Sequence, residues 1–355
     1  MHRDAYPYLG TRVGGQLYVM TRLPFGIASA CRIYTQVMAA VYRPVRQQGQ
    51  QLSYIIDDAL GVAQGHLQGR YQIRTLLMLF TALGLTPSMH KCSVEPGHAV
   101  VFRGLQLDSL QGLCTVPGEK LQYFQQLAQP MLDRGRATTR ELASAAGVLA
   151  SFQPGMFYAM MQARAYYEAG EGLPCDGTVV QLSAEAREEM QFWLEQMPGA
   201  NGRPLWGASP STILASDASD TAYAAYVVKG QPQRFVFQLD LTRLQRSQVQ
   251  SHELGSTLRE LGAITHCLRA LLRHRSGHIT NSRLLWLSDS KSAVANLVRM
   301  RGGTPEILQE VRQICWMAVQ NSISVDWQWR PRDEPEQAQA DYYTKESDTG
   351  GWTVR

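Results

Sequence analysis

Apolar runs of strand length alternate with helical patterns along the C-terminal part of the chain. These runs predict β-strands near residues 213–217, 222–228, 234–239, 284–288 and 323–329. Three consecutive strands, followed by helices and strands in alternation, predict a mixed sheet with helices on its faces.

A long amphipathic helix is expected between the third and fourth of these strands. Its apolar stripe is formed by Leu254, Leu258, Leu261, Thr265, Leu268 and Leu272. Glu260 lies beside this stripe, so we expect its carboxylate at the rim of the core.

The first part of the chain has shorter and less regular patterns. Short strands are expected on either side of a Gly-Gly turn within residues 1–22, and a strand–turn–strand over 52–62. Helices are expected over 29–45 and 70–83, and a hairpin of strands over 99–107 and 113–116.

Residues 117 to about 197 have helical spacing. Thr138 is followed three positions later by Glu141, which matches a capping box, and Ser183 is expected to cap a later helix. The segment 198–204 is rich in Pro and Gly and is predicted to be a linker.

Composition narrows the class of protein without naming a function. The 355 residues are 45% hydrophobic and 18% charged, a globular balance that argues against disorder. The net charge of +4 permits a polyanionic partner. The six cysteines form no CxxC pair, which favours reduced thiols in an intracellular protein, cytoplasmic or nuclear. No apolar run reaches the ~18 residues of a membrane span, so we expect no membrane association.

Four acidic residues stand where the expected elements would bring their carboxylates together. Asp217 and Asp289 each end an apolar strand-like run, Glu260 lies on the long helix, and Asp341 lies on the expected last helix. Like charges repel and raise each other's pKa, so four carboxylates can converge only with cations between them. Divalent cations with oxygen ligands remove that repulsion, and a metal pair can cleave a phosphodiester. The sequence therefore favours a nuclease.

A second acidic feature is the adjacent pair Asp57 and Asp58, at the expected tip of the strand–turn–strand. Ionised groups beside apolar residues need partners or metals, which favours a functional site. An exposed turn that only ends a strand explains the pair equally well.

These segments resemble a retroelement reverse transcriptase followed by its ribonuclease H domain. The palm-like series consists of LPFG at 23–26, IIDD at 55–58, GLTP at 84–87 with Lys91, and VFRGL at 101–105. The ribonuclease H-like series consists of DAS at 217–219, LRELGA at 258–263, SDS at 288–290 and AD at 340–341. STLREL at 256–261 and the ending with Trp352 look closest to DIRS-like retrotransposons.

The resemblance implies an α/β and α+β fold divided into four parts. These are a partial palm and fingers at 1–116, a helical thumb or connection with a linker at 117–204, a ribonuclease H-like domain at 205–345 and a tail at 346–355.

The resemblance also implies an activity for the second half of the chain. It is endonucleolytic cleavage of RNA in RNA–DNA hybrids with two Mg²⁺ or Mn²⁺ ions. Asp217, Glu260 and Asp289 would hold the first ion and Asp341 the second. The RNA strand would be chosen through its 2′-hydroxyl.

For the first half, the resemblance implies an RNA-directed DNA polymerase. Asp57 and Asp58 would be catalytic metal ligands, while Phe25, Gly26 and Lys91 would contact nucleotide or template. The partners would be a primer–template and, with a completed palm, a dNTP.

Three departures from the family pattern change these expectations. The family has a further catalytic Asp on an earlier palm strand, whereas Asp4 lies too close to Leu23 and is expected on the surface. We therefore expect a chain truncated in the palm, with little or no polymerase activity. Ile55 stands where the family usually has Tyr. The segment around Arg332 lacks the His that related domains carry near the last Asp.

Some questions stay open at the level of sequence. The alternative to an enzyme is a non-catalytic transposon relic or a recruited nucleic-acid-binding module, and the oligomeric state is open. Trp206, Trp286, Trp327 and Trp329 are expected in the core. A basic segment either follows a nucleic-acid backbone or is a solvated helix end; it comprises Arg269, Arg273, His274, Arg275 and His278.

Overall fold

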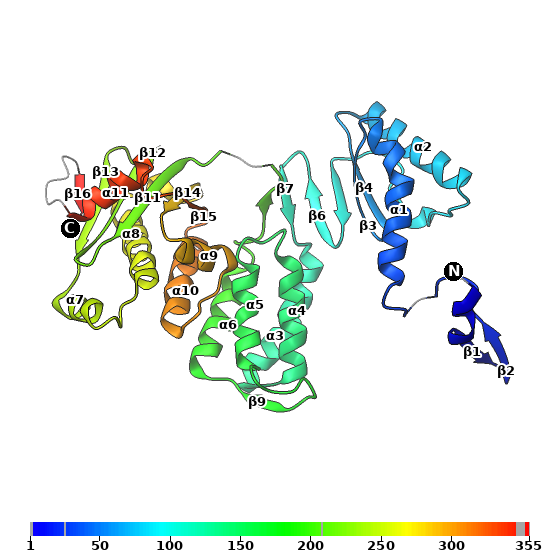
Figure 1. Ribbon diagram of the computed structural model, residues 1–355, viewed down its shortest axis with the longest axis horizontal. Coiled ribbons are helices and arrows are strands. Elements are labelled where there is room, and N and C mark those ends of the chain that lie inside the picture. The colour runs from blue at the N-terminus through cyan, green and yellow to red at the C-terminus, as the bar shows by residue number, and fades with distance from the viewer. Residues whose placement is uncertain (1–2, 25, 207–208, 346–351, 355) are drawn as a thin grey trace. The chain divides into compact units, whose positions relative to one another are not determined.

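The computed structural model describes residues 3–24, 26–206, 209–345 and 352–354 (Figure 1). Its chain divides into two compact units, Met1–Arg103 and Gly104–Arg355.

The first unit contains two hairpins and two longer helices. Its elements are η1 (Arg3–Tyr8), β1 (Gly10–Val13), β2 (Gln16–Val19), α1 (Ala30–Gln47), β3 (Gln51–Ile55), β4 (Asp58–Val62), α2 (His66–Ala82), η2 (Met89–Lys91) and β5 (Ala99–Phe102). The predicted hairpins around Gly14 and Asp57 and both predicted helices are confirmed.

A small core holds the first unit together. Met38 and Tyr42 of α1 pack with Leu52 of β3, and Phe80 of α2 lies against them. Tyr42 contacts the rings of Tyr54 and Phe80, with centroids 4.6 and 6.0 Å apart. Only three residues of this cluster are fully buried, so the apolar area that stabilises the unit is limited.

The second unit begins with a small sheet and a group of helices. Its first elements are β6 (Leu105–Asp108), β7 (Leu113–Thr115), α3 (Gly118–Arg134), β8 (Arg136–Thr138), α4 (Thr139–Phe152), α5 (Ala159–Ala169), β9 (Val179–Gln181), α6 (Ala184–Gln196) and β10 (Arg203–Pro204). Both expected caps are present. Thr138 and Glu141 form a reciprocal capping box, and the Ser183 hydroxyl accepts from the backbone N–H of Ala186.

Two sequence predictions for this region are wrong. The expected strand 99–107 is interrupted because Arg103 and Gly104 both have positive φ angles, of 53° and 71°. The expected linker is instead fastened to the small sheet. Asn201 accepts from the Val116 backbone N–H and donates to its carbonyl, at 2.8 and 2.9 Å, and β10 pairs with β7.

The rest of the unit is built on a six-stranded mixed sheet in the order β15-β14-β11-β12-β13-β16. Its elements are β11 (Thr212–Ala218), β12 (Ala222–Lys229), β13 (Phe235–Asp240), α7 (Arg243–Gln250), α8 (Ser256–Ile279), β14 (Arg283–Ser288), α9 (Lys291–Arg299), α10 (Pro305–Gln320), β15 (Ser324–Trp329), α11 (Pro335–Lys345) and β16 (Trp352–Val354). β11 runs antiparallel to β12 and parallel to β14, so β11 and β14 end at the same edge.

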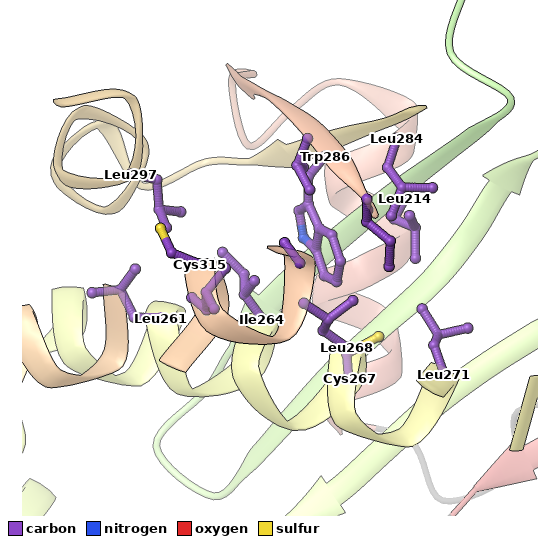
Figure 2. Close-up of a cluster of buried hydrophobic side chains, with 14 of the residues drawn as sticks. Leu214, Leu261, Ile264, Cys267, Leu268, Leu271, Leu284, Trp286, Leu297 and Cys315 are labelled. Atoms are coloured by element: carbon purple, nitrogen blue, oxygen red, sulfur yellow. The ribbon is translucent and has the colours of Figure 1, made fainter. Parts of the chain in front are cut away.

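Helices cover both faces of this sheet. Figure 2 shows Ile264 and Leu268 of α8 across from Leu214 of β11 and Trp286 of β14, and Leu261 belongs to the same buried cluster. Ala340 of α11 packs instead with Ala215 and Leu287, whose side chains point to the opposite face by strand alternation. All five predicted strands and the mixed sheet with helices on its faces are thus confirmed.

The core around α8 is broader than the predicted stripe. Residues 260–265 are all buried, while Leu258 and Leu272 are only partly buried. The helix is enclosed because α10 packs along it, and the buried Thr265 hydroxyl is satisfied by donating to Glu310 Oε2 at 2.5 Å. Glu260 is also buried, with 5% of its surface exposed, so its expected place at the rim of the core is wrong.

The helical region and the six-stranded sheet share this core. Tyr158 of α5 and Trp193 of α6 belong to the same buried cluster as α8, and the Tyr158 hydroxyl donates to the carbonyl of Ile323 at 2.9 Å. Phe192 stacks on Trp316 of α10, with ring centroids 4.3 Å apart.

Other expectations fail where the chain carries little apolar pattern. The helix α7, which has no buried residue, precedes α8, and two helices rather than one connect β14 to β15. Trp286 is buried and Trp327 partly buried, but Trp206 is 58% exposed and Trp329 also reaches the surface. In the described part of the chain, no helix combines the length and apolar character needed to cross a membrane.

The packing of α8 gives a first prediction. Leu268 is fully buried in the core of Figure 2, so Leu268→Ala should lower the free energy of unfolding by about 2–5 kcal/mol. Urea denaturation followed by tryptophan fluorescence measures the change. Leu244→Ala on α7 is the control, since its side chain is exposed and its loss should cost no more than about 0.5 kcal/mol. Equal effects of the two substitutions would contradict the assigned core.

Candidate metal centre

Two acidic residues meet at the edge of the sheet where β11 and β14 end. Ser216 pairs with Ser288 in the parallel register, so the next residues, Asp217 and Asp289, leave neighbouring strands side by side. The Trp286 indole donates to the Ser216 hydroxyl at 2.9 Å, which fixes the two strand ends relative to each other. The chain turns directly after Asp289 because the Ser290 hydroxyl caps α9.

Glu260 brings a third carboxylate to this edge from α8. One ligand atom from each of Asp217, Glu260 and Asp289 lies within 4.8 Å of the others. Among the residues that the structure describes, this is the one group of three or more acidic, His or Cys side chains with such spacing. The sequence had grouped these three residues, but it could not show how deeply Glu260 is buried.

Asp341 lies near this group but is not part of it. It projects from α11, and its Oδ2 accepts from Lys345 Nζ at 2.6 Å. Thr344, one position before that lysine, places its hydroxyl 3.4 Å from Asp217 Oδ2. Asp341 is close enough to act on Asp217 electrostatically, since it helps to raise the pKa of that residue.

The fold holds the carboxylates of this group close together although they repel one another, and their pKa values show this repulsion. Burial, followed by the charges of Asp289 and Asp341, raises the pKa of Asp217 to about 6. Burial, followed by Asp217 and Asp289, raises the pKa of Glu260 to about 9. Oε2 of Glu260 is buried and has no hydrogen-bond partner. The three residues thus form a site that favours an added positive charge.

The ligand chemistry fits a divalent cation such as Mg²⁺ or Mn²⁺. Carboxylate oxygens are the ligands these hard cations prefer. The unpartnered Glu260 oxygen supplies a donor atom that no protein group uses. Bound cations would also relieve the repulsion that raises the pKa of Asp217 and Glu260.

Arg332 also contacts this site, a contact that the sequence did not predict. Its Nε lies 2.8 Å from Asp289 Oδ2, and its Nη2 lies 3.8 Å from Asp217 Oδ1. The hydrogen bond to Asp289, together with the charges of Asp289 and Asp217, raises the pKa of Arg332. The only sequence signal was that arginine-rich residues 330–335 stand where related domains carry a His.

Trp329 and Lys291 also border the site. The Trp329 indole donates to the backbone carbonyl of Asp289 at 2.8 Å, so it holds the main chain that carries this carboxylate. The Lys291 ammonium lies 4.4 Å from the centre of the Trp329 ring, a cation–π contact. The expectation of Trp329 as a core residue is therefore wrong.

Those predicted palm residues that the structure describes belong to the first unit and form no comparable site. Asp57 occupies the β3–β4 turn and Asp58 begins β4, and both are exposed. Gly26 has a φ of 88°, which favours glycine, and Lys91 is exposed in η2. Phe25 lies outside the described residues.

The basic segment is exposed on the C-terminal half of α8. Arg269, Arg273 and His274 all face solvent, and Arg269 donates to Gln313 Oε1 of α10 at 3.0 Å. Arg275 departs from helical geometry, with a φ of −144° and a ψ of 31°. These positions fit both alternatives for the basic segment, which are contact with a nucleic-acid backbone and a solvated helix end.

Comparisons with solved structures identify the fold. The foamy viral protease-reverse transcriptase in complex with dsDNA matches with a TM-score of 0.50 at 14% identity, over 94% of this chain and 65% of that chain. Its dRH form in complex with ds DNA matches with a TM-score of 0.51 at 16% identity, over 92% and 54%. The complex with RNA/DNA hybrid has a TM-score of 0.49 at 14% identity, over 95% and 42%.

The chain thus spans between 42% and 65% of the length of these proteins. No protein-family model matches its sequence, and neither does any curated protein. The structural likeness shows that the chain has a reverse transcriptase/ribonuclease H-like fold, as the sequence predicted.

The raised pKa of Glu260 predicts how stability depends on pH without divalent cations. Its pKa of about 9 lies above the ordinary 4.5, so the folded state binds the extra proton between these values. The contribution of Glu260 to the free energy of unfolding is therefore fully present below pH 4.5 and is lost as the pH rises toward 9. Glu260→Gln removes this loss of stability. The free energy of unfolding of the variant should therefore equal that of the wild type near pH 4.5 and exceed it by about 1–3 kcal/mol near pH 8.5.

Thermal and urea unfolding in EDTA across this pH range provide the measurement. Glu253→Gln is the control, because that carboxylate is exposed and lies outside the group of three. If Glu260→Gln and the wild type lose stability in parallel over the whole range, the assigned burial and repulsion at Glu260 are wrong.

Proposed function

We propose that the second unit is a metal-dependent endonuclease that cleaves the RNA strand of RNA–DNA hybrids. The observation that carries this proposal is the group of three carboxylates at the end of β11 and β14, two of them buried and Asp289 partly buried, on a reverse transcriptase/ribonuclease H-like fold. Exposed acidic groups are common on proteins, whereas buried and mutually repelling ones are costly unless a cation joins them.

The carboxylates have distinct tasks in this proposal. Asp217, Glu260 and Asp289 would hold the first cation, and Asp341 would help to hold a second after releasing Lys345. Trp329 and Thr344 orient the ligands, since they contact the Asp289 carbonyl and Asp217 Oδ2. When bound, the cations supply an activated water and stabilise charge on the phosphate.

The substrate class follows from the fold and from the sequence motifs. Two similar structures are complexes with double-stranded DNA, which supports a nucleic-acid duplex as the ligand. The ribonuclease H-like motifs support a hybrid, in which the 2′-hydroxyl distinguishes the RNA strand from DNA. The net charge of +4 is compatible with a polyanion.

The origin of the chain is part of the same proposal. The motifs support a retroelement of the DIRS-like group as its source. The fourfold division at residues 116, 204 and 345 remains our assignment of palm and fingers, thumb or connection, nuclease and tail. An intracellular location, cytoplasmic or nuclear, follows from this origin and from the cysteine usage.

A non-catalytic nucleic-acid-binding role is the alternative function. One observation favours it: Arg332 and Lys345 already neutralise Asp289 and Asp341 within the protein. A relic that had lost its chemistry would retain such pairs without needing metal. Cleavage assays distinguish the two functions directly.

Cleavage of an end-labelled RNA–DNA hybrid tests the nuclease. With Mg²⁺ or Mn²⁺ the protein should cut the RNA strand alone, and Asp289→Asn should lower the rate at least about 100-fold because a direct metal ligand is lost. Asp240→Asn, an exposed carboxylate outside the group, should retain wild-type activity. Circular dichroism must show that all three proteins are folded.

Two outcomes would contradict the proposal. Equal cleavage by Asp289→Asn and the wild type would place the activity elsewhere or in a contaminant. A folded wild-type protein that binds the hybrid without cutting it, in either metal, would support the non-catalytic role.

The palm-like unit is proposed to lack an independent polymerase site. Asp57 and Asp58 are exposed in a hairpin turn, and no group of three metal-type ligands includes them among the described residues. Two-metal phosphoryl transfer needs ligands that bridge both ions, and two adjacent carboxylates supply too few.

Primer extension with labelled dNTP on an RNA template measures this property. Incorporation by the wild type should equal that of the Asp57→Asn/Asp58→Asn double variant. Incorporation that disappears in the double variant would show that the pair is catalytically competent.

A further inference from the structure

Two exposed basic side chains lie at the acidic residues, Arg332 against the group of three and Lys345 against the neighbouring Asp341. Arg332 contacts Asp289 and Asp217, and Lys345 contacts Asp341. The side chains of Arg332 and Lys345 are 68% and 62% exposed, whereas those of Asp217 and Asp289 are 3% and 11% exposed. The cations thus approach from solvent toward carboxylates that are fixed in the protein.

Arg332 differs from Lys345 because it contacts two members of the group of three. Its guanidinium takes a position from which it neutralises both Asp217 and Asp289. A divalent cation held by the same two carboxylates would place its charge against the guanidinium. The guanidinium and the divalent cation would repel each other if both contacted the same two carboxylates.

The segment that carries Arg332 is held in place without the Arg332 side chain. The Arg330 backbone N–H donates to the Ser288 carbonyl at 3.0 Å. The backbone N–H of Glu334 donates to the carbonyl of Pro331 at 3.2 Å. The guanidinium can therefore withdraw into solvent while the connection between β15 and α11 keeps its course.

We propose that Arg332 is an exchangeable internal counter-ion that competes with the divalent cation for Asp217 and Asp289. The inference rests on the proposed metal-dependent function and specifies how its site is regulated. In the metal-free protein Arg332 neutralises the two carboxylates. Metal binding displaces it, so Arg332 sets the metal concentration at which the site fills.

A positioning role for Arg332 predicts the opposite change in metal affinity. If Arg332 were a positioning residue that orients Asp289 for the metal, its removal would weaken metal binding. A competing counter-ion must do the reverse, since its removal frees both carboxylates and deletes a positive charge from the site. The sign of the change in metal affinity therefore decides between them.

The experiment is Mn²⁺ binding by the full chain, measured by titration calorimetry and by the electron paramagnetic resonance signal of free Mn²⁺ at one pH and salt concentration. Arg332→Gln should bind Mn²⁺ about three- to tenfold more tightly than the wild type, a range set by the modest strength of an exposed ion pair. Arg332→Lys, which keeps the charge, should stay within about twofold of the wild type.

Arg330→Gln is the matched control. It removes a guanidinium two residues away that pairs with Glu334 rather than with the acidic site. Its Mn²⁺ affinity should equal that of the wild type. The Mg²⁺ concentration that half-saturates hybrid cleavage should fall in Arg332→Gln by the same factor as the Mn²⁺ dissociation constant.

The outcomes separate this inference from the proposed function. Mn²⁺ binding that is lost in Asp217→Asn but is unchanged or weakened in Arg332→Gln overturns the counter-ion role and leaves the metal site intact. Mn²⁺ binding that is absent in the wild type, or unaffected by Asp217→Asn, overturns the proposed function and the counter-ion role with it.

Discussion

The burial of α8 against the sheet is the constraint on which the acidic site depends. Apolar side chains along this helix pack on β11 and β14, and that packing carries Glu260 into a region with little water. The free energy of the apolar contacts holds three carboxylates closer together than they would lie in solution. The repulsion that results is a property of the fold, and it prepares the site for a positive charge before any ligand arrives.

The same core explains why the helical region belongs with the six-stranded sheet. Tyr158 and Trp193 lie in the same buried cluster as Ile314 and Ala318 of α10. Arg312 of α10 pairs with Glu168 of α5 and with Glu189 of α6. Glu189 is buried, and its pKa is raised by burial despite the opposing charge of Arg312. Arg312 is partly buried, so this ion pair joins α10 to α5 and α6 at the margin of the shared core.

The sequence was informative where apolar periodicity and local caps determine structure. The strands on either side of Asp217 and Asp289 followed from short apolar runs, and Thr138 and Ser183 marked helix starts through hydrogen bonds within one turn. The shared edge of β11 and β14 then brought three of the four expected acids together. Strand length and strand order were enough for that much of the site.

Other features depend on contacts that no local pattern encodes. The helix α7 is short and has only two apolar side chains, Leu244 and Val249, so it gave little periodic signal. The helix α9 ends at Met300 in a left-handed conformation that no local sequence signal predicts. The burial of Glu260 arises where α8 packs on β11 and β14, strands that only the tertiary fold brings against the helix. Arg332 and Trp329 reach the site from a connecting segment and a strand end, where side-chain direction follows from the tertiary fold.

The fastening of residues 201–204 to the small sheet bears on how such a chain can change over evolutionary time. Flexible linkers between domains usually tolerate the exchange of whole domains, and the sequence of this segment predicts such a linker. Here Asn201 closes two hydrogen bonds with Val116, and Tyr158 reaches the carbonyl of Ile323 from the other side of that junction. A cut at this point would separate residues that share one interior, so the helical and nuclease-like parts are constrained to be inherited as one piece.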